Sequence, residues 1–79
     1  MSAEVETFRP APSPEQVRQR LMAVFEQTVA SIATSSQPIA QYGIALGVAG
    51  ALQVCELITK GHYAALIEVA AIQLRHASE

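Results

Sequence analysis

The chain has 79 residues, of which 51% are hydrophobic and 15% charged, and its formal net charge is −2 at pH 7. This length fits one domain at most, near the lower limit at which a single core stabilises a fold. Five basic residues are scattered among seven acidic ones, so no basic patch for a nucleic-acid backbone is expected. The single cysteine excludes an intramolecular disulfide, which leaves oligomerisation as the expected source of extra stability.

Residues 1–13 are predicted to form an extended N-terminal arm. Prolines at three alternate positions fix φ and disfavour a helix, and no periodic apolar pattern accompanies them. Two alternatives remain for the arm, disorder in isolation or docking across a partner subunit, in which Phe8 is a candidate contact. The acidic start of the chain differs from a secretory signal, and the lack of a disulfide framework favours a cytoplasmic location.

The residues Ser13-Pro14-Glu15-Gln16 predict the start of a helix over 14–33. Serine at the N-cap, proline at the first helical position and glutamine at the third are the parts of a capping box. Apolar residues then recur at helical spacing, which predicts an amphipathic helix with one face on the core. That face holds Val17, Leu21, Val24, Phe25, Val29 and Ile32.

The segment 38–57 predicts a central helix with a single charge, at Glu56. A short polar connector, in which Ser36 is a candidate cap, places this helix antiparallel to the first. Small side chains recur along one seam of the helix, which consists of Ala40, Gly43, Gly47, Gly50, Val54 and Leu57. Each interior glycine costs about 1 kcal/mol relative to alanine, and close packing of another backbone would offset that cost. The seam is therefore the predicted self-association interface of a homodimer.

The rest of the central helix is apolar on several faces, so it should be buried nearly all round. Cys55 is accordingly predicted to be a small buried hydrophobic residue. The competing interpretation is that the glycines break the segment into a shorter helix and a loop.

A third helix is predicted over 60–76, after a tight turn. Thr59 is the expected N-cap, with Ile58 and Tyr63 forming a hydrophobic staple. Alternatively, Gly61 is the residue that ends the central helix. The expected fold is thus all-α, a small three-helix domain over 14–79 in which the third helix packs on an antiparallel helical hairpin.

No set of residues in the sequence assembles an active site, a metal site or a cofactor site. His62 and His76 lie near opposite ends of one predicted helix, about 21 Å apart at 1.5 Å per residue, so they cannot share a ligand within one chain. We therefore expect a chain without enzymatic activity or cofactor. His62 and Tyr63, at the start of the third helix, remain candidate contacts for a partner protein.

Two other classes of function are weaker alternatives. A small-residue seam also associates membrane-spanning helices, but Gln41 and Gln53 interrupt the apolar run and no anchors flank it on both sides. A DNA-binding subunit would fit the two helices and tight turn, but the third predicted helix carries one arginine, Arg75.

The favoured hypothesis is a non-catalytic module that binds another protein as an adaptor or inhibitor. In size, acidity and lack of catalytic motifs the whole chain resembles the small accessory proteins with which phages and other mobile elements block host machinery. Anti-CRISPR proteins and host-regulator antagonists belong to that set. The resemblance is one of size and composition, and it implies an inhibitory role without naming a target.

Overall fold

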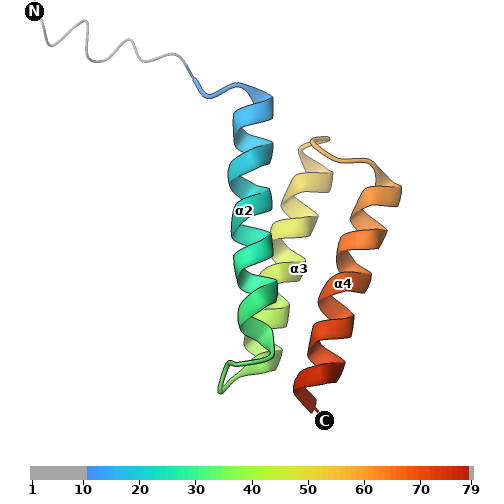
Figure 1. Ribbon diagram of the computed structural model, residues 1–79. Helices are drawn as coiled ribbons and strands as arrows, with labels where there is room; N and C mark the ends of the chain where they lie inside the picture. The colour runs from blue at the N-terminus through green and yellow to red at the C-terminus, as the bar shows by residue number, and fades with distance from the viewer. Residues whose placement is uncertain (1–10, 79) are drawn as a thin grey trace, which may run out of the picture.

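The computed structural model describes residues 11–78 of the chain. They form three helices, α2 (Pro14–Ile32), α3 (Pro38–Val54) and α4 (Lys60–Ser78). Figure 1 shows each helix running antiparallel to the one before it. The predicted all-α fold is confirmed for the described residues. Most of the predicted arm, Phe8 included, lies outside them.

α2 begins with the capping box that the sequence predicts. Ser13 Oγ accepts a hydrogen bond from the Gln16 backbone N–H at 3.2 Å, and Gln16 Oε1 accepts one from the Ser13 backbone N–H at 3.0 Å. Two backbone donors at the helix end are thereby satisfied. Glu15, in the same first turn, accepts hydrogen bonds from the Arg18 side chain, and this lowers the pKa of Glu15.

α3 is one continuous helix through Gly43, Gly47 and Gly50, so the interpretation in which the glycines break it is wrong. Pro38 occupies the first helical position and makes Gln37 the N-cap, which means that Ser36 does not cap the helix. The Gln37 side chain makes no capping hydrogen bond either.

The C-terminal end of α3 lies three residues before the predicted one, because the chain turns at Glu56. Glu56 has φ 59°, in the left-handed region. The Leu57 N–H donates to the Leu52 carbonyl at 2.9 Å, and the Glu56 N–H donates to the Gln53 carbonyl at 3.0 Å. These two bonds form a Schellman motif, whose left-handed position glycine usually occupies. Nothing in the sequence signals such an end at a glutamate.

Thr59 caps α4, as predicted. Its Oγ1 accepts a hydrogen bond from the His62 backbone N–H at 3.0 Å. Gly61 lies in the first turn of α4 without a positive φ, so the alternative in which Gly61 ends the central helix is wrong. Ile58 and Tyr63, the predicted staple, are both half-buried against the core.

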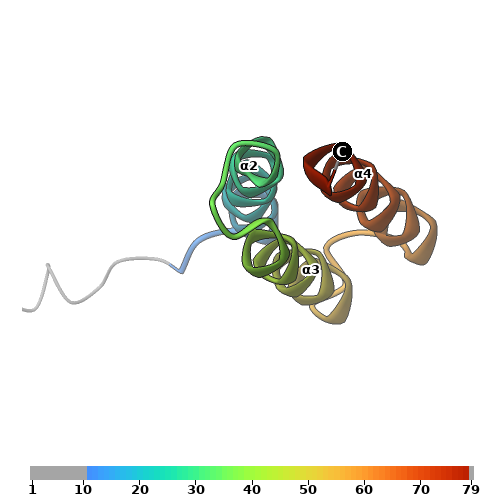
Figure 2. The same cartoon turned by 90° about the horizontal axis from the view of Figure 1, so that it is seen from below.

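The hydrophobic core lies on one side of α3. α2 and α4 both pack on α3 and contact each other less extensively. Figure 2 shows α2 and α4 on the same side of α3. The buried core residues of the described chain are Phe25, Val29, Ile32, Ala45, Ala49, Leu52, Leu66 and Ala70. Burying each of the largest aliphatic side chains among them, Ile32 and Leu52, contributes about 1.5–3 kcal/mol.

Candidate interaction surface on α3

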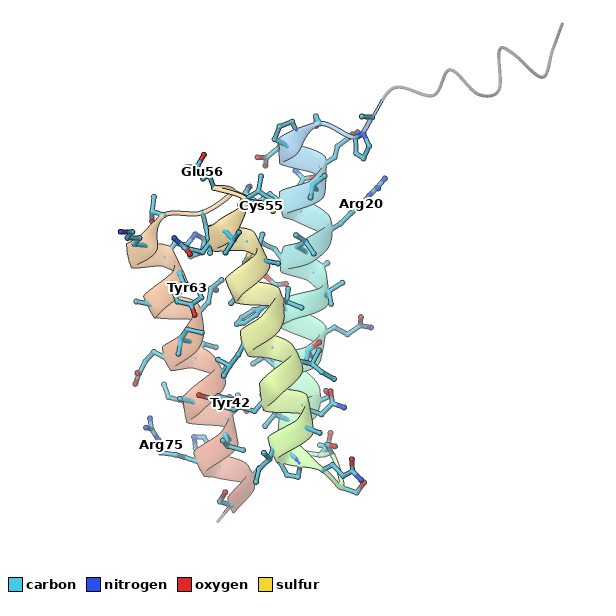
Figure 3. The ribbon with its side chains drawn as sticks, turned by 180° about the vertical axis from the view of Figure 1, so that it is seen from behind. Arg20, Tyr42, Cys55, Glu56, Tyr63 and Arg75 are labelled. Atoms are coloured by element: carbon cyan, nitrogen blue, oxygen red, sulfur yellow. The ribbon has the colours of Figure 1, made fainter. Side chains whose placement is uncertain are left out.

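The side of α3 that points away from α2 and α4 is an apolar surface, here termed the outer face. Figure 3 looks at the molecule from this side, with α3 in front of the other two helices. Because α3 turns by about 100° per residue, its residues opposite the buried Ala45, Ala49 and Leu52 share this face. They are Ile39, Ala40, Gly43, Ile44, Gly47, Gly50, Ala51 and Val54. None of these side chains is charged or forms hydrogen bonds.

The large residues of the outer face are in contact with water in the single chain. Ile39 is 77% exposed, Ile44 51% and Val54 78%. Full burial of such a side chain contributes about 1.5–3 kcal/mol, so covering this face would release a substantial free energy. The expectation that α3 is buried nearly all round is therefore not met within one chain.

The glycines of the outer face have open space in front of them. A Cβ added at Gly43, Gly47 or Gly50 would meet no other atom within 4 Å. α2 and α4 instead approach α3 on its opposite side, where Ala45 and Ala49 are fully buried. Packing within the chain therefore does not offset the roughly 1 kcal/mol that each glycine costs the helix.

The structure places five of the six residues of the predicted self-association interface on the outer face. Leu57, the sixth, lies beyond the end of α3 and packs against the core. The predicted seam omitted Ile39, Ile44 and Ala51, which share the face. The 3.6-residue period places these three positions opposite Ala45 and Ala49, but only the packing of α2 and α4 shows which of the two sides is uncovered.

The other residues singled out in the sequence lie away from the outer face. His62 is exposed and Tyr63 half-buried, both at the start of α4. Cys55 is exposed, so the prediction that it is buried is wrong. The reason is that α3 ends at Val54, whereas the predicted helix ran to residue 57. Cys55 therefore lies at the C-cap, beside Glu56 (Figure 3).

The described residues offer few other features that point to a ligand. Residues 11–78 form no pocket, and their histidine, cysteine and acidic side chains make no group of three or more that could hold a metal ion. In the same range, no helix combines the length and the hydropathy needed to cross a membrane. Comparison with protein-family models, with curated proteins and with solved structures found no match for this chain.

Proposed function

We propose that the chain is a non-catalytic protein-binding module whose binding surface is the outer face of α3. The observation that carries this proposal is the presence of exposed Ile39, Ile44 and Val54 beside open glycines on one uncharged face. Covering exposed apolar surface is favourable, and contiguous apolar patches mark interaction sites. The glycines let a partner backbone come closer than side chains normally allow, which adds van der Waals contact.

The chemistry of the outer face selects the kind of partner. Since none of its side chains donates or accepts a hydrogen bond, polar groups that a partner placed there would lose their bonds to water without replacement. The partner surface that fits is the apolar stripe of another helix. Binding of this kind covers a helix of the partner that another protein would otherwise contact. Covering a contact surface in this way is how an adaptor or inhibitor acts.

The small core of the chain supports the same proposal. In the described residues eight hydrophobic side chains are buried, and three of these are alanines. A core of this size contributes little stability, and small domains commonly gain the remainder by association. A partner bound to the outer face would supply such a contribution. It would act on α3, the only one of the three described helices that packs extensively on both others.

The test is affinity capture of the tagged chain from a lysate of its source cells, treated with nuclease. Gly47→Glu places a carboxylate in the middle of the outer face without a clash, because the space there is open. Gly61→Glu is the matched control, since a Cβ at Gly61 meets only the Thr59 Oγ1 at 3.9 Å. Circular dichroism verifies that both variants remain helical.

We expect the wild type and Gly61→Glu to recover the same protein in a stoichiometric amount and Gly47→Glu to lose it. Equal recovery by all three chains would contradict the assignment of the outer face. Recovery of no other protein would contradict the adaptor or inhibitor role.

A further inference from the structure

We infer that the occupant of the outer face is the outer face of a second copy, in an antiparallel pair of α3 helices whose two-fold axis passes through Gly47. This inference rests on the proposed function, because it names the partner of the same surface. A two-fold pair uses one patch twice, so the patch must complement itself in shape and in charge. α3 has both kinds of complementarity.

The distribution of large and small residues on the outer face fits an antiparallel pair. Residues equally far from Gly47 on opposite sides lie at the same level along the two helices. Ile44 is then level with the second copy's Gly50, each three residues from Gly47, and Val54 is level with the second copy's Ala40, each seven residues away. These two large side chains are thus each level with a small residue, which is the arrangement that fills space evenly.

A parallel pair distributes the same volumes poorly. Every residue would be level with its own copy, so Ile44 would meet Ile44 and Val54 would meet Val54. The large residues would then hold the helices apart at the levels where they meet and leave gaps beside Gly43 and Gly47, which have no side chain to fill them.

The two ends of α3 are also complementary in charge. At its N-terminus the Gln37 side chain makes no capping hydrogen bond and the first turn contains no acid, so the positive end of the helix dipole has no compensating side chain of its own. At the other end stands Glu56, an exposed acid. The antiparallel pair brings each Glu56 level with Pro38, at the start of α3 in the other copy. A parallel pair would instead place both Glu56 carboxylates at one end.

The expected dimer is concentration-dependent. α3 has 17 residues, or about 25 Å at 1.5 Å per residue. One pair of helices of this length is a small interface compared with the roughly 800 Å² per partner of stable complexes. The pair should therefore dissociate on dilution.

Disulfide trapping tests both the occupant and the orientation. In a Cys55→Ser background, Ala40→Cys and Val54→Cys place one thiol near each end of the outer face. Two chains of different mass, one with each substitution, are mixed in equal amounts and mildly oxidised. Random pairing of an equal mixture gives roughly twice as much disulfide between the two different chains as of either homodisulfide, and we expect the antiparallel pair to exceed that ratio clearly. Ala23→Cys, at an exposed position of α2, gives the level of random collision.

A disulfide between the two different chains that is no more than about twice either homodisulfide would overturn the antiparallel orientation. Disulfide formation no greater than with Ala23→Cys would overturn the second copy as the occupant. Circular dichroism of each variant before oxidation shows that the helices are intact, so that an absent disulfide is not a loss of folding.

The charge argument has its own test, the dissociation constant of the dimer from sedimentation equilibrium. Glu56→Gln should raise this constant roughly three- to thirtyfold at low ionic strength, the range expected when the two charges near helix ends in each dimer are both removed, and less in high salt. Glu68→Gln, an exposed acid on α4, should leave it unchanged. Equal effects of the two substitutions would overturn the placement of Glu56 beside the second copy.

The outcomes separate this inference from the proposed function. If the chain stays monomeric but still captures another protein in a Gly47-dependent way, the second copy is overturned and the binding face is retained. If Gly47→Glu changes neither the mass of the chain in solution nor the captured protein, the second copy and the binding face are both overturned.

Discussion

Glu56 stands in a backbone conformation that is unfavourable for a residue with a side chain. A left-handed residue other than glycine costs roughly 1–2 kcal/mol, and the two hydrogen bonds of the Schellman motif hold it in place. Glycine would relieve this strain but would remove the single acid of the sequence segment 33–59. In the antiparallel pair that acid lies beside the uncapped start of the other α3, which gives the strained residue a role.

Glu56→Gly should therefore stabilise the monomer, by about 1 kcal/mol, because glycine adopts the left-handed conformation without strain. Urea denaturation at low protein concentration measures the effect. The same substitution at Glu68, in the interior of α4, should destabilise by about 1 kcal/mol, the usual cost of an interior glycine. Destabilisation of similar size at both positions would show that Glu56 is not left-handed in solution.

The caps of α2 and α3 predict a second contrast between single residues. Ser13→Ala removes one hydrogen bond of the capping box and leaves the Gln16 backbone N–H without its acceptor, so it should cost about 1 kcal/mol. Ser36→Ala should change stability by less than about 0.5 kcal/mol, because Ser36 is exposed and caps no helix. Thermal denaturation of the two variants measures the difference. A larger loss from Ser36→Ala than from Ser13→Ala would contradict the observed caps.

At the scale of the element, α3 has two small-residue sides with different roles. Ala45 and Ala49 let α2 and α4 approach on the inner side, whereas the glycines face open space on the outer side. Alanine suffices where helices of the same chain pack. Glycine, with its cost in helix stability, occurs where we place the second copy.

Substitutions on the two sides of α3 should have opposite effects on the stability of the monomer. Gly43→Ala should stabilise it by about 1 kcal/mol, because the added methyl enters open space and alanine favours the helix. Ala49→Leu should destabilise it by about 1–3 kcal/mol, because the larger side chain overfills a fully buried position. Both are measured by denaturation at concentrations where the chain is monomeric. Destabilisation by Gly43→Ala would show that another element of the chain covers that position.

The sequence predicted the helices well where local signals determine them. The capping box at Ser13 and the N-cap at Thr59 place two helix starts by residue type alone, and both are confirmed. The end of α3 was missed because a left-handed glutamate has no compositional signal. Cys55 was misplaced for the same reason, since its burial depended on a longer helix.

The candidate site was predictable in part. The small-residue seam follows from spacing, and most of it lies on the outer face. Spacing alone could not separate the two sides of α3, because alanine and glycine both permit close approach and isoleucine occurs on the outer side. Only the positions of α2 and α4 show that Ile39 and Ile44 are exposed. The helix pattern does not specify which protein would cover them.

At the scale of the whole molecule, α3 is packed on one side and uncovered on the other. A second copy would cover the uncovered side and place the two α3 helices at the centre of the assembly, with α2 and α4 of each copy on the outside. This arrangement would remove the exposed apolar residues of α3 from water, and it would use the glycines that the single chain leaves without a contact. Because such a pair would dissociate on dilution, the monomer would still offer the outer face to another protein.

Sedimentation equilibrium over a wide range of concentrations tests this account most directly. The measured masses of the wild type and of the control Gly61→Glu should rise with concentration from the monomer value of 8.4 kDa towards twice that value. Gly47→Glu should remain at 8.4 kDa throughout, because it places two carboxylates against each other on the two-fold axis. A wild-type mass that stays at 8.4 kDa, or a Gly47→Glu chain that dimerises as the wild type does, would contradict the pairing of outer faces.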